Sequence, residues 1–264
     1  MPEGDVVWYT AKRLHAALAG QVLTRSDFRV PRYATVSLTG QVVTEATARG
    51  KHLLIRTGAG LTVHTHLKME GYWRIVAAGA RPPGRSFQLR LLLGNAQWLA
   101  AGFLLGITEV LRTAHEDQVV GHLGPDLLGP DWDAAGAALA AERLAREPGR
   151  PIGEALLDQR NVAGAGTIYA SEMMFLRGID PWRTVGSLST DELTALVELG
   201  HRLLDANKER PGHVTTGDAR PGRENWAYGR AGRPCRRCGT VILKGEAGPA
   251  GQERVRYWCP NCQR

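Results

Sequence analysis

The chain has 264 residues, of which 43% are apolar, enough for a buried core in one large domain or two smaller ones. Its 33 basic residues exceed its 26 acidic residues by seven, and the sequence pI of about 9.5 favours a polyanionic partner, nucleic acid above membrane. No run of about 18 apolar residues and no secretory signal pattern occurs, which argues against a membrane-spanning helix and predicts a cytoplasmic protein that is not secreted.

The chain starts with Met1-Pro2-Glu3-Gly4. Removal of Met1 would make Pro2 an N-terminal secondary amine, and an α-amine titrates near ~8, well below a lysine near ~10.4. Part of this amine is therefore an unprotonated nucleophile at neutral pH, able to form an iminium with an aldehyde-level carbon. The carboxylate of Glu3, one residue on, is placed to move protons. The alternative is that Pro2 is only a rigid start before a helix.

The first half of the chain is predicted to be one helix followed by strands. Residues 5–19 place apolar side chains at helical spacing, and Gly20 is a plausible stop. Short β-favouring runs separated by Gly, Pro and Asn then extend to about residue 112, and their spacing predicts a β-sandwich or barrel. The expected strands are residues 21–30, 40–46, 52–56, 61–66, 72–77, 87–93 and 97–101, with a hairpin turn at Gly94-Asn95.

Three places in this β region carry polar or exposed side chains that are candidates for function. Lys51 follows Arg49-Gly50 at the start of a strand, and His64 and His66 alternate onto one face of another. Met69 lies at the tip of an expected loop, where an apolar side chain can wedge between DNA bases. Taken singly, each is also explained as an ordinary surface or core residue.

The second half is predicted to be helical. We expect helices at residues 131–147, 152–159, about 167–177 and 189–207, with Thr167 and Ser189 as N-caps. The turn Gly164-Ala165-Gly166 leads into the third of these, and backbone N–H groups at such a helix start can hold a phosphate. An ordinary helix hairpin explains the same turn. Residues 208–233 are rich in Arg and Gly with interleaved aromatics, which suits either nucleic-acid contact or a solvated connector.

The strongest local pattern is Cys235-x2-Cys238-x20-Cys259-x2-Cys262. Two Cys-x-x-Cys pairs at this separation predict four thiolates around one tetrahedral Zn²⁺, which is structural because no coordination position stays open. Residues 240–244 and 254–258 are expected to form a hairpin between the pairs, with residues 245–253 as its tip. Such zinc ribbons also mediate protein contacts, so the metal by itself does not predict DNA binding.

Taken together, the motifs resemble those of the formamidopyrimidine-DNA glycosylase/endonuclease VIII family of base-excision repair enzymes. The resemblance runs along the whole chain in the same order, and the Gly4 start, Arg49-Gly50-Lys51 and Tyr257-Trp258 favour the endonuclease VIII branch, which removes oxidised pyrimidines. Met69 is shared more with the formamidopyrimidine branch. The motifs are Met1-Pro2-Glu3-Gly4, Arg49-Gly50-Lys51, His66-Leu67-Lys68-Met69-Glu70-Gly71, Leu156-Leu157-Asp158-Gln159, the run from Val162 to Glu172, Gly178-Ile179-Asp180-Pro181, the run from Tyr228 to Cys235, and the run from Tyr257 to Gln263.

The resemblance implies a multidomain α+β fold with an N-terminal β-sandwich and leading helix, a C-terminal helix–two-turn–helix domain and a zinc-finger β-hairpin. The implied limits are residues 1–115 for the catalytic β-sandwich, 116–130 for a linker, 131–225 for the helix–two-turn–helix domain and 226–264 for the zinc finger. The partner implied is DNA with damaged bases or abasic sites, bound by a monomer, with the damaged nucleotide flipped out of the stack.

The resemblance also implies a role for each candidate residue. Pro2 attacks C1′ of the deoxyribose, the base leaves, and β- and then δ-elimination nick the strand, with Glu3 as acid/base partner. Lys51 assists catalysis and contacts phosphate, and Met69 fills the void left by the flipped base. Further phosphate contacts are implied for His66, Gly166, Thr167 and Arg254, and the zinc ligands are Cys235, Cys238, Cys259 and Cys262.

Three departures from the family pattern affect these roles. Thr167 stands where Asn is usual, so that phosphate contact would use a hydroxyl and the backbone. A Glu that normally follows the starting motif is missing, because Val6 takes its place and Asp5 lies one position earlier. The gap between the two Cys pairs is longer than usual, which places an insertion at residues 245–253. Pro2 and Glu3 are retained, so we expect an active enzyme.

Three alternatives stay open on the sequence. The protein could be a lyase that acts only on abasic sites, a non-catalytic nucleic-acid-binding module with the same fold, or a zinc-ribbon factor that binds proteins. A free N-terminal Pro2, left by removal of Met1, together with an intact Glu3 distinguishes a lyase from the two non-catalytic alternatives. The preferred lesion and the preferred DNA form are not readable from the sequence.

Overall fold

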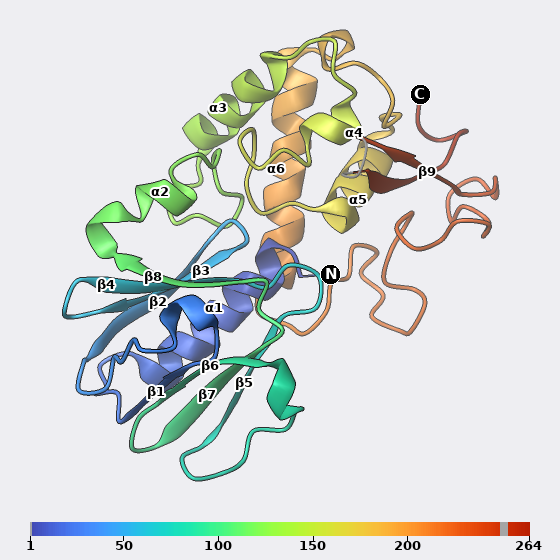
Figure 1. The fold of residues 1–264 in the computed structure, drawn as a ribbon. Helices are drawn as coiled ribbons and strands as arrows, with labels where there is room; N and C mark the ends of the chain where they lie inside the picture. The colour runs from blue at the N-terminus through green and yellow to red at the C-terminus, as the bar shows by residue number, and fades with distance from the viewer. Residues whose placement is uncertain (1, 249–252) are drawn as a thin grey trace. The chain divides into compact units, whose positions relative to one another are not determined.

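The computed structural model describes residues 2–248 and 253–264, which form two compact units (Figure 1). The first unit contains Pro2 and residues 6–122, and the second contains residues 3–5 and 123–264. The chain thus passes between the units three times, between Pro2 and Glu3, between Asp5 and Val6 within its first helix, and between His122 and Leu123. The domain limits given above stay predictions.

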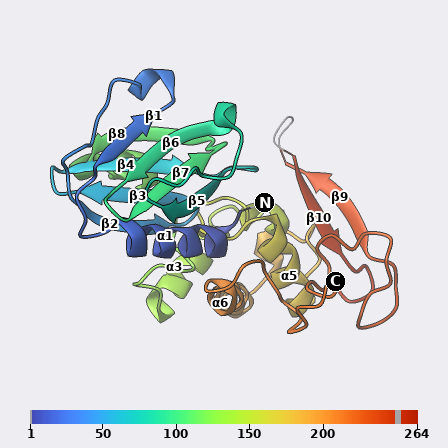
Figure 2. The same cartoon turned by 90° about the horizontal axis from the view of Figure 1, so that it is seen from below.

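The first unit is a β-sandwich of two four-stranded antiparallel sheets (Figure 2). One sheet has the strand order β1-β6-β7-β5 and the other β2-β3-β4-β8. The strands are β1 (Arg25–Phe28), β2 (Val43–Arg49), β3 (His52–Thr57), β4 (Leu61–His66), β5 (Tyr72–Ala77), β6 (Leu89–Gly94), β7 (Trp98–Phe103) and β8 (Ile107–Arg112).

Apolar side chains from both sheets and from helix α1 (Gly4–Leu18) form one core in this unit. Alternate residues along a strand face opposite sides, so Leu53 and Ile55 of β3 point into the core together with Leu91 and Leu93 of β6. On α1, Val7, Ala11, Leu14 and Leu18 recur at helical spacing and are buried in the same core. The β-sandwich and its leading helix, predicted from these two periodicities, are confirmed.

Two details of the first unit were not predicted. Strand β8 lies at the edge of its sheet, and its side chains are mostly half-buried, so the sequence alternates too weakly to reveal it. A short helix α2 (Asp117–Val120) follows it. The turn predicted at Gly94-Asn95 is present, because the Asn95 side chain accepts the N–H groups of Gln97 and Trp98.

In its described residues, the second unit contains four further α-helices around a separate core. Helix α6 packs against both α3 and α5 (Figure 1). The elements are α3 (Ala134–Ala145), α4 (Ile152–Ala155), α5 (Thr167–Arg177) and α6 (Thr190–Asn207). No helix in the described part of the chain is long and apolar enough to cross a membrane.

The helix ends correct two predictions. Ser189 caps α6 as expected, through a capping box with Glu192. Thr167 is not an N-cap, because Gly166 takes that position and Thr167 is the first helical residue of α5. The helix predicted at 152–159 ends at Ala155, because the Asp158 side chain accepts the backbone N–H of Arg160 and turns the chain.

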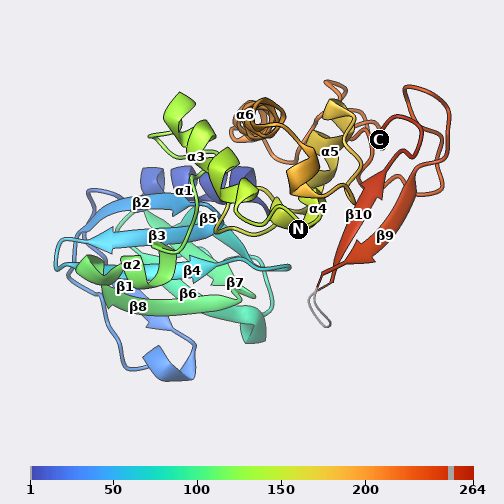
Figure 3. The same ribbon diagram turned by 90° about the horizontal axis from the view of Figure 1, so that it is seen from above.

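The last element is an antiparallel hairpin of β9 (Leu243–Ala247) and β10 (Arg254–Trp258), which packs on α5 (Figure 3). Its first strand starts three residues later than predicted. The reason is that residues 240–242 pair with the segment around Cys235 instead, where the Cys235 N–H donates to the Thr240 carbonyl and the Ile242 N–H donates to the Arg233 carbonyl. The predicted insertion lies partly outside the described residues.

Candidate functional site

Glu3 is held at the start of helix α5. Its Oε2 accepts the N–H groups of Gly166 at 2.7 Å and Tyr169 at 3.3 Å, and its Oε1 accepts the N–H of Ile168 at 2.8 Å. The side chain is buried, with 1% of its surface exposed. A helix N-terminus leaves such N–H groups without intrahelical partners and favours negative charge, so this arrangement stabilises the ionised carboxylate. Pro2, half-buried, directly precedes it.

The turn before α5 fits closely against the start of the chain. Gly164 has a left-handed backbone (φ +103°), which only glycine adopts without strain, and its carbonyl accepts the Gly4 N–H at 2.9 Å. A Cβ on Gly4 would lie 3.0 Å from the Gly164 Cα. Gln159 braces the same turn, since its Oε1 accepts the Gly164 N–H and its Nε2 donates to the Ala165 carbonyl. The Gly-rich turn thus holds the N-terminal residues.

A second carboxylate, Asp5, lies in the same place. Its Oδ2 accepts the hydroxyl of Tyr169 at 2.7 Å, while its buried Oδ1 has no hydrogen-bond partner among the described residues. Burial, together with the charges of Asp5 and Glu3, raises the pKa of Tyr169 far above its usual value, so the hydroxyl stays protonated and donates. Asp5 is therefore buried and held by Tyr169, one residue before Val6, which stands where the family usually has a Glu.

The first unit brings Lys51, His66 and Met69 to neighbouring positions. Lys51 precedes β3 after Gly50, His66 ends β4 opposite His52, and Met69 follows in the turn with 64% of its surface exposed. Burial, then the charges of Lys68 and Lys51, lowers the pKa of His66 to about 4. The Lys68 N–H donates to His66 Nδ1 at 2.9 Å, so the neutral ring carries its proton on Nε2.

Behind His66 lies a chain of hydrogen-bonded side chains. His64 Nδ1 contacts a Glu109 oxygen at 2.6 Å, and His64 Nε2 contacts His52 Nδ1 at 2.8 Å. The His52 ring meets the His66 ring edge-on with centroids 4.9 Å apart. Burial first, then the nearby His66, His64, His122 and Lys68, lowers the pKa of His52 to about 3. Glu109 accepts from His64 Nδ1, and one of the two facing nitrogens of His64 and His52 donates to the other.

Glu172 on α5 organises the loop that follows α6. Its carboxylate is fully buried and accepts the backbone N–H groups of Trp226, Ala227 and Tyr228, each at 2.8 Å, as well as the Thr215 hydroxyl. One charged group thus fixes a loop that carries three consecutive N–H donors toward it. This loop lies within residues 208–233, for which the sequence predicts either nucleic-acid contact or a solvated connector.

The four cysteines come together as predicted. Their Sγ atoms all lie within 4.8 Å of one another, with 3.5 Å between Cys238 and Cys259 and 3.9 Å between Cys235 and Cys262. A tetrahedral ion with bonds of about 2.3 Å to sulfur would place the sulfur atoms about 3.8 Å apart. The cluster therefore fits a metal ion.

Of the other candidates, Gly166 and Thr167 lie with Glu3 at the start of α5, and Arg254 is exposed at the start of β10. The sequence did not reveal a role for His52, Glu109, Tyr169 or Glu172. His52 directly follows Lys51, and Tyr169 and Glu172 lie within the quoted run after Gly166, so their positions were visible. Their hydrogen-bond partners lie 45 or more residues away for three of the four, and no local pattern marks such pairs.

Two family models match the chain. The formamidopyrimidine-DNA glycosylase N-terminal domain matches residues 1–101, and the formamidopyrimidine-DNA glycosylase H2TH domain matches residues 123–216.

Named relatives match the chain over its full length. A probable endonuclease 8 2 of Streptomyces coelicolor is 54% identical and covered to 94%, and the DNA-(apurinic or apyrimidinic site) lyase Nei2 of Mycolicibacterium smegmatis is 50% identical and covered to 99%. A formamidopyrimidine-DNA glycosylase of Stutzerimonas stutzeri is 34% identical and covered completely.

Solved structures share the fold. Lactococcus lactis formamidopyrimidine-DNA glycosylase in complex with DNA containing an abasic site has a TM-score of 0.81 at 25% identity, with both chains covered completely. A complex of the same glycosylase with tetrahydrofuran-containing DNA and an inhibitor gives the same TM-score and identity. The chain belongs to the formamidopyrimidine-DNA glycosylase/endonuclease 8 family, and it groups with relatives that carry endonuclease 8 and AP lyase names.

Proposed function

We propose that the protein is a bifunctional DNA glycosylase and AP lyase of base excision repair that removes oxidised bases, with pyrimidines as its main substrates. The observation that carries the proposal is the Glu3 carboxylate, fixed by three N–H groups directly beside Pro2. The relatives named endonuclease 8, AP lyase and formamidopyrimidine-DNA glycosylase support the same two activities.

Pro2 is the proposed nucleophile, once Met1 is removed. Its secondary amine attacks C1′ of the damaged nucleotide, the C1′–N bond breaks, and the base leaves after protonation. Opening of the sugar gives an iminium, which makes a C2′ proton acidic. Loss of that proton breaks the C3′–O bond, and a second elimination breaks the C5′–O bond. The products are a one-nucleotide gap with a terminal phosphate on each side.

Glu3 is proposed to act beside this amine. Three N–H donors favour its ionised form, which stabilises the positive charge that develops on the sugar and on the iminium. To take up a proton, Glu3 exchanges one of these N–H donors for the proton of the substrate. Alternatively, the hydrogen-bonded pair of Asp5 and Tyr169 next to it carries the proton. This electrostatic role adds to the acid/base role predicted for Glu3.

The remaining candidates are proposed to hold the DNA. Lys51 and the Nε2–H of His66 contact phosphate, as do the N-terminal residues of α5, Gly166 and Thr167. Arg254, which lies on the hairpin, contacts a further phosphate. The exposed Met69 fills the space that the flipped nucleotide leaves in the stack, as apolar wedges do in other DNA-bending proteins.

Zinc is the proposed occupant of the cysteine cluster. Four thiolates at these spacings suit Zn²⁺, and a site with four protein ligands leaves no position for substrate. The ion would be held by Cys235, Cys238, Cys259 and Cys262 and would fix the hairpin that presents Arg254. It takes no part in the reaction at Pro2.

The proposed partner is DNA that carries damaged bases or abasic sites. The Lactococcus lactis relative in its solved complexes binds DNA with an abasic site, and the net charge of +7 suits the same ligand here. We propose a monomer that acts on chromosomal DNA in the cytoplasm, at the nucleoid.

A narrower activity, cleavage of abasic sites alone, is the second candidate. The relative from Mycolicibacterium smegmatis is named a DNA-(apurinic or apyrimidinic site) lyase, and two departures of this chain, Thr167 and the missing Glu, fall at the site. Base removal needs protonation of the leaving base, and cleavage of an abasic site does not.

Borohydride trapping tests the proposal. Protein with a free Pro2, verified by intact mass, is mixed at low salt with oligonucleotides carrying thymine glycol, 5-hydroxycytosine, 8-oxoguanine or an abasic site. We expect a covalent adduct on the oxidised pyrimidines and on the abasic site, and its loss in Pro2→Gly.

The pattern of adducts separates the candidates. An adduct on the abasic site alone would reduce the protein to a lyase. No adduct on any oligonucleotide, with Pro2 free and zinc bound, would leave a DNA-binding protein without this chemistry.

A further inference from the structure

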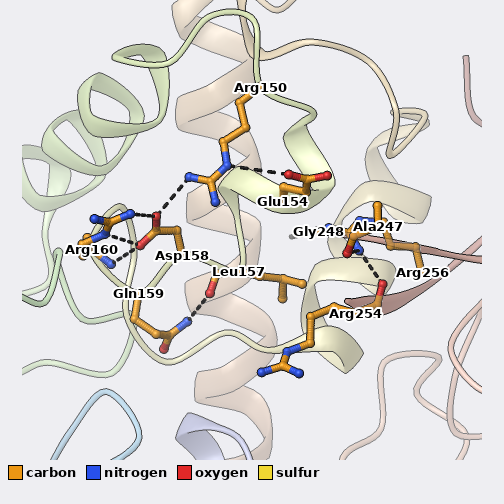
Figure 4. Close-up of a pocket in the computed structure, with 10 residues that line it drawn as sticks. All are labelled: Arg150, Glu154, Leu157, Asp158, Gln159, Arg160, Ala247, Gly248, Arg254 and Arg256. Carbon is orange, nitrogen blue, oxygen red and sulfur yellow. Dashed lines mark hydrogen bonds and ion pairs between the residues drawn. The ribbon is translucent and has the colours of Figure 1, made fainter. Parts of the chain in front are cut away.

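Several arginines gather at each of two cavities. The cavity between the 150–160 segment and the hairpin (Figure 4) contains Arg254, the proposed phosphate contact, and its carboxylates Glu154 and Asp158 both pair with Arg150. The other cavity lies in the first unit and is lined by none of the residues that the proposed function uses. The reaction at Pro2 therefore does not account for this second cavity.

The second cavity lies on the outer face of the β1-β6-β7-β5 sheet, the face turned away from the sandwich core. Leu91 and Leu93 of β6 are in the core, so Leu92 between them points outward. A solvated outer face normally carries polar side chains. Here it carries a separate apolar cluster of Leu89, Leu92, Leu99, Ala101 and Phe103.

Residues 78–88, which connect β5 to β6, cover part of this apolar face. Gly84 lies against the Phe103 ring, since a Cβ at Gly84 would come within 2.6 Å of it. A cavity of about 300 Å³ is left between this segment and the sheet, with Leu89, Leu92, Leu99 and Phe103 along its sheet side. Ligand pockets range from about 300 to 1,000 Å³, so this one suits a single bulky side chain better than a cofactor.

The rim of the cavity is positively charged. It contains the exposed side chains of Arg25 and Arg29 on the β1 side and of Arg81 in the covering segment. Among residues 6–44 and 71–108, which include all four strands of this sheet, the sequence has one acidic residue, Asp27, and it pairs with Arg29 at 3.1 Å. Three guanidinium groups against one carboxylate make the rim complementary to an acidic ligand.

A polypeptide matches this surface better than DNA does. Lys51 and His66, the phosphate contacts proposed for this unit, adjoin strands of the other sheet and do not line the cavity. Duplex DNA would match the arginines but has no free apolar group to place in the cavity. Phe87 in the covering segment has 70% of its surface exposed, and exposed aromatic side chains next to arginines are typical of protein interfaces.

We propose that this cavity is the docking site of a partner protein, which inserts one bulky apolar side chain from an acidic segment. The inserted side chain would be buried against Leu92, Leu99 and Phe103, and carboxylates on either side of it would pair with Arg25 and Arg81. Apolar burial supplies affinity, and the charge pairs select an acidic segment. The inference goes beyond the proposed function, because this contact takes no part in the reaction at Pro2.

Peptide titrations followed by amide correlation NMR test the proposal on the full-length, zinc-loaded protein. The probe is the capped peptide Asp-Asp-Phe-Asp-Asp, and two matched peptides replace its Phe by Gly or its Asp residues by Lys. We expect the probe to shift the amide signals of residues 79–81 and 84–86 and of Leu92 and Leu99. Its dissociation constant should be at least about tenfold lower than that of either matched peptide, a difference that burial of one Phe side chain can supply.

Variants of the rim and of the apolar side identify the groups that bind. Arg25→Glu combined with Arg81→Glu changes two exposed side chains and should weaken binding of the probe about tenfold. Arg112→Glu is the matched control, because Arg112 is an exposed arginine at the end of β8 in the other sheet. Leu92→Gln should also weaken binding, and its melting temperature shows whether the fold is kept.

Equal binding of the Phe and Gly peptides would overturn the proposal, and so would wild-type affinity in the double arginine variant. A short undamaged duplex that shifts the same amide signals more strongly than the probe would make this face a DNA contact and refute the peptide site. If Leu92→Gln unfolds, the arginine variants decide. A protein that traps on abasic DNA but ignores the peptide refutes this inference alone, and one that binds the peptide but never traps refutes the proposed function alone.

Discussion

The histidines beside the proposed phosphate contacts form a cluster in which the pKa values of His52 and His66 are lowered. His52, His64 and His66 share one sheet, and Lys51, Lys68 and His122 lie around them. Positive neighbours and burial both oppose protonation, and Glu109 and Glu116 are the acidic groups that face His64. The hydrogen bond between His64 Nε2 and His52 Nδ1 needs one of these two nitrogens to be without a proton, which the low pKa of His52 provides.

This cluster should make the stability of the first unit depend on pH. The unfolded chain takes up protons near pH 6.5, whereas the folded pKa values are about 3 for His52 and about 4 for His66. The unfolded state thus binds more protons between these limits, and the free energy of unfolding falls as the pH drops from about 6.5 toward 4. We expect a lower urea midpoint at pH 5.5 than at pH 7.5.

His52→Asn isolates this effect. Asn keeps a donor for His64 Nε2 but does not titrate, so the variant should lose less stability between pH 7.5 and pH 5.5 than the wild-type protein. Any effect of acid on the cysteine cluster is common to both proteins and cancels in the comparison. An equal loss in the two proteins would contradict the assignment to His52.

At the scale of elements, the start of α5 and the start of the chain form one structure. The N–H groups of α5 bind Glu3, and the turn before α5 binds Gly4. The hydrogen bonds to Glu3 fix its carboxylate, and the close approach of the two backbones leaves no space for a side chain on Gly4. The position of the Glu3 carboxylate, the proposed catalytic group, thus depends on a glycine that carries no chemistry itself.

Gly4→Ala should therefore impair catalysis more than stability. The added methyl group lies 3.0 Å from the Gly164 Cα and about as close to its carbonyl oxygen, so the N-terminal residues must shift by a few tenths of an ångström. Misplacement of catalytic groups by about 1 Å can cost about 100-fold in rate. For this smaller shift we expect a loss of about tenfold in the single-turnover cleavage of abasic DNA.

Gly149→Ala is the control for this substitution. Gly149 has open space around its Cβ position and no left-handed backbone, so the change should alter neither rate nor melting temperature. A Gly4→Ala protein with the wild-type rate would show that the contact with Gly164 does not position Glu3.

The sequence predicted elements well where the signal was local. Helix α1, seven strands of the sandwich, the cap at Ser189 and the cysteine pairs follow from periodicity and spacing. It did not reveal edge strand β8, whose half-buried side chains alternate weakly. Nor did it reveal that Glu3 binds residues 163 or more positions away, since a hydrogen bond between distant segments leaves no local pattern.

For the whole molecule, the two units have separate cores, and the cysteine cluster belongs to only one of them. Cys235 and Cys259 pack with Phe175, Ala227 and Ile242 in a small core of the second unit. A core of this size gives little stability by itself, so the bound metal should supply much of the order in this region.

Removal of the metal should therefore unfold the hairpin region and leave the sandwich intact. We expect a strong chelator to increase hydrogen exchange in residues 226–248 and 253–262, while residues 43–66 keep their protection. Hydrogen exchange with mass spectrometry measures both in one sample, and re-addition of Zn²⁺ should restore protection. Loss of protection in the sandwich as well would show that the units unfold together.

The burial of the first residues has a practical consequence for anyone who produces this protein. Glu3, Gly4 and Asp5 are all buried, so the beginning of the chain is an internal part of the fold and not a free tail. An affinity tag, an acetyl group or a retained formyl-methionine at that end would block the amine of Pro2, the proposed nucleophile, at a distance from the cysteine cluster in the sequence. Such a preparation should fail the trapping assay for this reason alone, so a tag belongs at the C-terminus.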